Sequence, residues 1–201
     1  MKKTLLVLGF IALSALGIIY LGSTIETNAS NDGVELSLTP DENGNYALED
    51  MLTAALLDEY LALATYEQII EVYGEMRPFT RIIEAEKQHI ELLLPLFEAY
   101  GIELPNPDVS EFVVIPTSIT EALATGVDAE IANIALYESF LSQEDLPEDV
   151  RTVFEYLQNA SENHLRAFSR DRMVGAGYEF AYKMRNQFGR GNQNKGQGFN
   201  R

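Results

Sequence analysis

Glu86 and His89 are a carboxylate and an imidazole that interrupt a run of hydrophobic positions between Ile82 and Leu93. On the 3.6-residue period of an α-helix, both residues share one face with the apolar residues around them. Leaving an unpaired charge in a dry interior costs on the order of several kcal/mol. Two such groups on a buried face must therefore be protonated, hydrogen-bonded or bound to a metal ion. A single Glu-x-x-His is weak evidence, because the pattern occurs by chance on many helices.

Three further segments with helical periodicity carry a polar residue in the middle of their apolar stripe. These residues are Glu59, Glu130 and His164. A buried Glu, His and Tyr network that is satisfied by its own hydrogen bonds is the alternative to a metal site, and it would explain one such helix. Four intrusions at matching places favour a site that performs chemistry.

A tyrosine follows each of two glutamates at the same spacing. Tyr66 lies seven residues after Glu59, and Tyr137 lies seven residues after Glu130. Seven residues make two helical turns, so each tyrosine shares the face of its glutamate. Its hydroxyl could there hydrogen-bond a ligand carboxylate and hold it in position.

Four helices must position these residues, and the sequence marks where they begin and end. Gly74 and Gly101 follow two periodic segments, Pro78 suits a first helical turn, and Ser118 with Glu121 fits a capping box. The predicted helices cover residues 47–73, 79–100, 118–142 and 147–170. Residues 102–116 read as a long crossover that packs along the bundle. We therefore predict an all-α four-helix bundle with this crossover between its second and third helices.

Composition limits the chemistry and the partners of this bundle. The 201 residues contain no cysteine, so a metal ion would have to be held by oxygen and nitrogen atoms. The formal net charge is −17 at pH 7, which argues against general binding of nucleic acid or anionic lipid, because phosphate binding relies on Lys and Arg. The length suits one domain with tails.

The N-terminal segment, residues 1–29, predicts export. Two lysines precede an apolar run at residues 5–22, and this order is typical of a signal peptide or an N-terminal membrane anchor. The sequence Thr27-Asn28-Ala29 offers a cleavage site, which favours a removed leader. We expect an extracellular, cell-surface or periplasmic protein that meets a membrane only through this segment if it is not cleaved. Residues 30–46 are rich in turn residues and are predicted to form a linker.

The C-terminal segment, residues 171–201, differs in charge from the body. Residues 170–201 hold seven Lys or Arg against two acids, whereas residues 26–169 hold 5 basic and 29 acidic residues. The segment is of low complexity, with an amphipathic stretch at 178–188 that could form a short helix. It is predicted to be either a solvated terminus or a basic arm that docks on acidic neighbours, which would support homo-oligomers or self-assembly.

The order of these motifs resembles the rubrerythrin branch of the ferritin-like superfamily. The motifs are Glu-x6-Tyr, Glu-x-x-His, Glu-x6-Tyr and a final histidine, and they extend over roughly residues 47–170. The segments 55–60 and 160–165 look closer still to an exported bacterial and archaeal ferritin-like domain family of unknown function. The resemblance implies a bundle with a di-iron or di-manganese centre, zinc being an alternative, that oxidises ferrous iron or reduces peroxide or dioxygen.

The resemblance also implies a role for each residue. Glu86 would bridge two ions, while Glu59 and Glu130 would each bind one of them. His89 and His164 would each supply one nitrogen, and no catalytic residue is expected beyond these ligands.

One position departs from the family pattern. Ser161 stands where the second Glu-x-x-His of rubrerythrins has its bridging glutamate, so Ser161 is expected beside the site without being a ligand. Glu162 lies about 100° around the helix from it and would be an additional ligand only if the last turn were distorted. The chain has no cysteine-rich domain to supply electrons, so a peroxidase cycle would need an outside reductant. The alternative is a non-catalytic, self-assembling cell-surface protein with a remnant or structural metal site.

Overall fold

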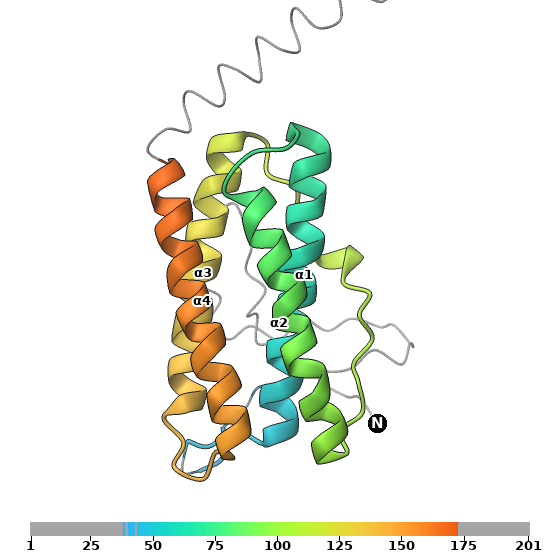
Figure 1. Ribbon diagram of the computed structural model, residues 1–201, viewed down its shortest axis with the longest axis vertical. Coiled ribbons are helices and arrows are strands. Elements are labelled where there is room, and N and C mark those ends of the chain that lie inside the picture. The colour runs from blue at the N-terminus through green and yellow to red at the C-terminus, as the bar shows by residue number, and fades with distance from the viewer. Residues whose placement is uncertain (1–37, 39, 43, 173–201) are drawn as a thin grey trace, which may run out of the picture.

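Four long α-helices make up the body of the protein (Figure 1). The computed structural model describes residues 38, 40–42 and 44–172. The elements are α1 (Leu48–Tyr73), α2 (Phe79–Tyr100), the short 3-10 helix η1 (Ser110–Phe112), α3 (Ile119–Leu141) and α4 (Glu148–Arg172). The predicted all-α four-helix bundle is confirmed, and each helix begins and ends within two residues of its predicted bounds.

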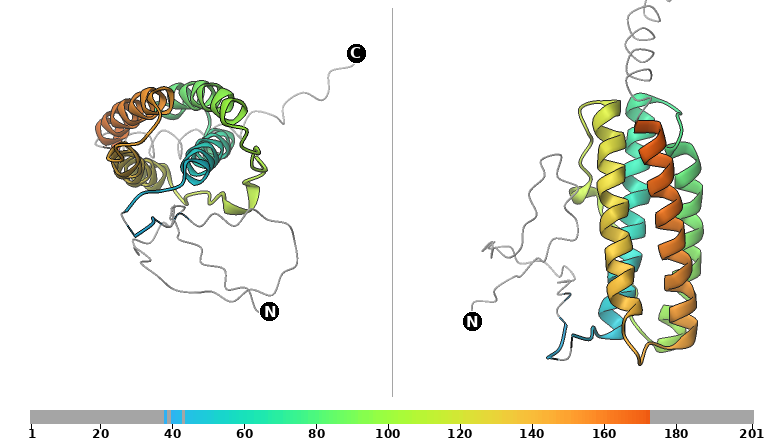
Figure 2. Two further views of the ribbon diagram at one scale, coloured as in Figure 1. Left: turned by 90° about the horizontal axis from the view of Figure 1, so that it is seen from below. Right: turned by 90° about the vertical axis from the view of Figure 1, so that its left-hand side faces the viewer.

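The long connection between α2 and α3 fixes the directions of the helices. The chain rises through α1, descends through α2, and returns along the side of the bundle past η1, which packs against α1 (Figure 1). As a result α3 descends and α4 rises. Seen along its axis, the bundle has one helix at each corner (Figure 2). Thus α1 is antiparallel to α3, and α2 is antiparallel to α4.

Local signals explain where the helices end. Gly101 follows α2 with φ +64°, a left-handed conformation that glycine adopts without steric cost, and its N–H bonds back to the last turn. Ser118 caps α3, because its hydroxyl accepts a hydrogen bond from the N–H of Glu121 at 3.1 Å. The predicted capping box is only half correct, since the Glu121 carboxylate accepts from the backbone N–H and the hydroxyl of Thr117.

Two hydrophobic clusters fill the bundle, one toward each end. One includes Leu52, Phe97 and Phe154, and the other includes Phe79 and Phe168. All five side chains are fully buried or nearly so. The polar residues singled out in the sequence lie between these clusters, in the middle of the bundle. The apolar clusters therefore separate the polar centre from both ends of the molecule.

Several predicted segments lie partly or wholly outside the described residues. These are the leader or anchor at 1–29, most of the linker at 30–46, the tail beyond residue 172 and the short helix at 178–188. Within the linker, Leu38 is buried against the first cluster, and the Tyr46 N–H bonds the side chain of Gln143. None of the helices that the structure describes combines the length and the apolar character needed to cross a membrane.

Candidate metal centre

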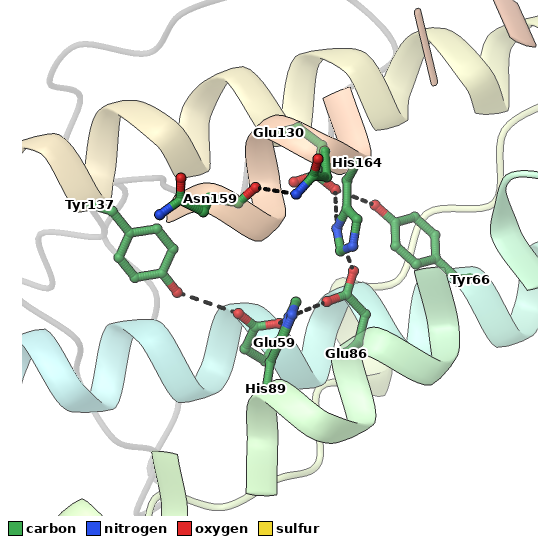
Figure 3. Close-up of polar contacts among 9 residues, drawn as sticks. Glu59, Tyr66, Glu86, His89, Glu130, Tyr137, Asn159 and His164 are labelled. Atoms are coloured by element: carbon green, nitrogen blue, oxygen red, sulfur yellow. Dashed lines mark hydrogen bonds and ion pairs between the residues drawn. The ribbon is translucent and has the colours of Figure 1, made fainter. Parts of the chain in front are cut away.

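Five polar residues from all four helices converge in the middle of the bundle (Figure 3). Their exposed fractions lie between 2% and 8%, so water has almost no access to them. They are Glu59 on α1, Glu86 and His89 on α2, Glu130 on α3, and His164 on α4. These are the five residues that the sequence predicted as metal ligands, and the fold brings all five together.

The five residues form two groups of three that share one member. In the first group, His89 Nδ1 lies 3.1 Å from Glu59 Oε2 and 2.8 Å from Glu86 Oε2. In the second, His164 Nδ1 lies 3.5 Å from Glu86 Oε1 and 3.4 Å from Glu130 Oε1. In each group, one oxygen or nitrogen atom per residue lies within 4.8 Å of the others, close enough to surround one ion.

Glu86 is the shared member, and its two oxygens face opposite sides of the cluster. Oε2 faces His89 and Oε1 faces His164. The two imidazole rings lie against each other with centroids 5.6 Å apart and planes 28° from parallel. The arrangement offers a carboxylate and an imidazole to each of two positions, with a third carboxylate between them.

Both tyrosines reach the cluster, but each contacts the glutamate of the other helix. Tyr66 on α1 donates to Glu130 Oε1 at 3.4 Å, and Tyr137 on α3 donates to Glu59 Oε1 at 3.3 Å. The reason is the antiparallel course of α1 and α3. Two turns along α1 lead away from Glu59 and toward the level of Glu130, and the reverse holds for α3. A tyrosine and a glutamate on one helix share a face but are too far apart along the axis to bond.

Ser161 and Glu162 differ sharply in their surroundings. Ser161 is 6% exposed and its hydroxyl hydrogen-bonds Glu130, so it lies beside the cluster as predicted. Glu162 is half-exposed, and its Oε2 pairs with Arg166 at 3.4 Å one turn along α4. The structure therefore does not bring Glu162 into the cluster, and α4 continues as one helix through this turn.

Comparison with known proteins places the chain in a family. It is 30% identical over 128 residues to the uncharacterized protein MJ0754 of the archaeon Methanocaldococcus jannaschii, covering 56% of this chain and 68% of that protein. The chain belongs to the family of that archaeal protein. No protein-family model matches it.

A solved structure shows a similar fold. It is the dodecameric thioferritin, a bacterioferritin-related protein, from Bacteroides fragilis. The TM-score is 0.54 at 19% identity, and the similarity covers 70% of this chain and 89% of that one. The fold of the present chain is therefore ferritin-like.

The charges of the cluster are balanced by protons when it holds no cation. Burial raises the pKa of Glu86, and the neighbouring Glu59 raises it further, while the bond to His89 acts against both. Burial likewise raises the pKa of Glu130, with His164 opposing. Burial alone would lower the pKa of His89, but its bonds to Glu59 and Glu86 outweigh this and raise the pKa to about 10. Protons thus compensate the buried carboxylates in place of a metal ion.

Asp58 is a residue near the centre that the sequence analysis missed. It is half-buried between α1 and α3, where its side chain hydrogen-bonds Asn133. Burial, together with the charges of Glu59 and Glu130, raises its pKa to about 8. Asp58 lies one position before Glu59 and therefore about 100° around the helix from the stripe that Glu59 interrupts. The small residues opposite it on α3 are the signal that could have revealed the close contact between the two helices.

Proposed function

We propose that this protein binds two divalent metal ions, with iron the first choice, and uses them to oxidise ferrous iron or to reduce peroxide or dioxygen. The observation that carries the proposal is the position of Glu86, whose two carboxylate oxygens face two different histidines at 2.8 and 3.5 Å. A network that served only to satisfy buried hydrogen bonds would not need one carboxylate shared between two matched Glu and His sets. A ferritin-like fold and overlapping groups of Glu and His support the same conclusion.

The residues present fit such ions in type and number. Carboxylate oxygen and imidazole nitrogen suit iron, manganese and zinc, and the chain has no thiolate to compete. Glu59 and His89 would hold one ion, Glu130 and His164 the other, and Glu86 would contribute one oxygen to each. Three carboxylates leave two divalent ions with one net positive charge, which a hydroxide or another anion would balance. Ser161 leaves room for such an anion, because it replaces a carboxylate with a hydroxyl.

The ions would supply Lewis acidity and electrons at two adjacent positions. The protein contributes the surroundings. Tyr66 and Tyr137 hold the carboxylates of Glu130 and Glu59 in orientation, and Ser161 bonds Glu130 from a third side. The apolar clusters above and below exclude bulk water, which strengthens every electrostatic interaction at the centre. Reduction of one peroxide to two waters consumes two electrons and two protons. Those electrons would come from ferrous iron or another outside reductant, because the 201 residues contain no cysteine to hold an iron–sulfur or rubredoxin-type centre.

The cellular setting is part of the proposal. The basic start and apolar run of residues 1–29 support export, with residues 5–22 as a cleaved leader or a retained anchor. Its substrate would then be ferrous iron or peroxide outside the cytoplasm. Mass spectrometry tests both export and cleavage of the leader. The protein is recovered from the cell fractions of its native host, and the mass of its N-terminal peptide is measured. An N-terminal peptide beginning at residue 1 in the cytoplasmic fraction would contradict export.

A second function is favoured by one observation, the serine at position 161. Without the second bridging glutamate, the centre would be the remnant or structural metal site of a non-catalytic bundle that assembles through its acidic body and basic tail. The thioferritin of similar fold forms a dodecamer, which supports assembly of this protein into oligomers as part of this second function. The two functions differ in whether ferrous iron is oxidised.

Metal titration tests the proposal directly. Chelator-treated protein should bind two ferrous ions per chain and oxidise them in air, with near-ultraviolet absorption developing as it does so. The variant Glu86→Gln should lose both ions, because both groups share Glu86, whereas Glu59→Gln should weaken one. Glu162→Gln is the matched control, because Glu162 is a half-exposed acid near the same site. Binding without oxidation, or no uptake of ferrous iron by the wild-type protein, would overturn the proposed oxidation and favour the non-catalytic function.

A further inference from the structure

A small cavity with a mostly apolar wall and a few polar groups lies between α1 and α3, on the side of the bundle next to the candidate metal centre. The space open to the centre of a water molecule is about 20 Å³, and one water needs roughly 10–15 Å³ on this measure. Small residues make this space, because both helices place alanine, threonine or glycine where they face each other. They include Ala62 and Thr65 on α1 and Ala122, Gly126 and Ala129 on α3.

Thr65 gives the cavity its chemical character. The residue is 2% exposed. Its Oγ1 is the buried side-chain polar atom that lacks a hydrogen-bond partner within the described part of the chain. Buried hydroxyls are nearly always bonded to protein or to an ordered molecule, because an unsatisfied one retains its full desolvation cost. A hydroxyl without a protein partner on the wall of a water-sized cavity therefore points to a small ligand.

The cavity is connected to the metal centre through its own lining. Tyr66, the next residue after Thr65, lines the cavity and donates its hydroxyl to Glu130. Asp58 and Asn133, which are half-buried and bonded to each other, also line it. The wall thus contains both residues that contact solvent and a residue that contacts a proposed metal ligand.

We propose that this cavity is a binding site for one uncharged, water-sized oxygen compound: water at rest, and hydrogen peroxide when it is present. Thr65 supplies the hydrogen bond. A hydrated metal cation is too large for the space, and an anion would meet the negative field of Glu59 and Glu130. The binding of water does not depend on the proposed function. The use of the cavity by peroxide on its way to the metal ions rests on the proposed function.

Crystals of metal-free protein test the site without relying on metal binding or turnover. The wild-type protein should show one ordered water within hydrogen-bond distance of Thr65 Oγ1. Thr65→Val, which keeps the shape and removes the hydroxyl, should lose that water, and Thr65→Ser should keep it. Thr53→Val is the matched control, because Thr53 is a buried threonine on the same helix that does not line the cavity. A wild-type cavity without density, together with a higher melting temperature for Thr65→Val, would overturn the proposal.

Peroxide soaks of the same metal-free crystals test the second occupant. Density at Thr65 should lengthen from one oxygen to two in wild type and in Thr53→Val, and should be absent in Thr65→Val. Density that remains a single oxygen at a saturating peroxide concentration would contradict peroxide binding and restrict the site to water. Because these crystals contain no metal, the result is separate from that of the iron titration. A chain that binds no iron but holds peroxide here would disprove the proposed function and retain the cavity site.

Discussion

At the scale of single residues, the exchange of partners between the two tyrosines is the most informative feature of the centre. Tyr66 bonds Glu130 and Tyr137 bonds Glu59, across the space between α1 and α3. Each hydroxyl restrains a carboxylate that would otherwise be free to rotate. The tyrosines thereby couple the two halves of the bundle at the level of the cluster.

Double-mutant cycles should reveal this exchange. Tyr66→Phe combined with Glu130→Gln should be non-additive in the free energy of unfolding of the metal-free protein, by about 1 kcal/mol, because the pair shares a hydrogen bond. Tyr66→Phe combined with Glu59→Gln should show a smaller coupling. Urea unfolding of the single and double variants measures both energies. A stronger coupling of Tyr66 to Glu59 than to Glu130 would show that Tyr66 bonds the glutamate of its own helix.

The sequence predicted the members of the cluster but not these pairings, for a physical reason. Helical periodicity determines which face a residue shares, and it was enough to bring Glu59, Glu86, His89, Glu130 and His164 together. A bond between two helices depends in addition on how far one has slid along the other. That offset is set by tertiary packing, such as that of the Phe168 ring against the backbone at Gly126, and no pattern within one helix encodes it. Asp58 was missed for the same reason.

At the scale of helices, the boundaries were predictable because local chemistry marks them. Gly101 and Ser118 act on backbone groups within a few residues of themselves, so no tertiary information is needed. Glu121 shows the limit of such rules. It is positioned for a capping box but bonds Thr117, a competing donor one residue before the cap.

Gly126 sets the distance between α3 and its neighbour α4. A Cβ atom built at this position would lie 2.6 Å from the ring of Phe168, well inside van der Waals contact. The ring cannot easily withdraw, because it packs against Tyr66 and Phe79 with centroid distances of 5.7 and 5.4 Å. The close approach thus explains a glycine in the interior of a helix, where it otherwise reduces stability.

Gly126→Ala should therefore destabilise the protein by about 1–3 kcal/mol, the usual cost of overpacking a core. Helix propensity alone would predict the opposite, a gain of about 1 kcal/mol. Thermal unfolding of the metal-free form distinguishes the two signs. Ala135→Gly, an exposed change on the same helix, measures the propensity effect by itself. A rise in melting temperature for Gly126→Ala would mean that α3 and α4 are farther apart than the structure has them.

At the scale of the whole molecule, the bundle encloses acidic side chains whose ionised forms are disfavoured by burial. Asp58, Glu86 and Glu130 all have raised pKa values, chiefly through burial, and His89 has a raised pKa through its carboxylate partners. A metal-free chain can retain this arrangement only by binding protons. On the proposed function, metal ions and protons would be alternative occupants of one cluster, and pH should affect the two forms of the protein in opposite directions.

For metal-free protein, the sign follows from comparing folded and unfolded states. Burial raises the pKa of the Asp58 carboxyl to about 8 in the folded protein, against an ordinary value of 3.8. His89 keeps its proton to about pH 10 when folded, against 6.5. For each group, the folded state binds more protons than the unfolded chain at pH values between its unfolded and folded pKa. Stability should therefore fall as pH rises from about 5 to about 9, by at most about 1.4 kcal/mol per pH unit for each such proton.

The metal-loaded protein should behave in the reverse way over the same range. Its ligands bind ions only as carboxylates and neutral imidazoles, so rising pH removes the competing protons and increases metal affinity. Chemical unfolding at several pH values, with and without saturating manganese, compares the two forms, manganese being chosen because it resists oxidation. Exposed acids such as Asp108 and Asp149, whose pKa values are lowered by hydrogen bonds, titrate below this range and do not obscure it. Parallel pH profiles for the two forms would show that protons and metal ions do not compete for the cluster.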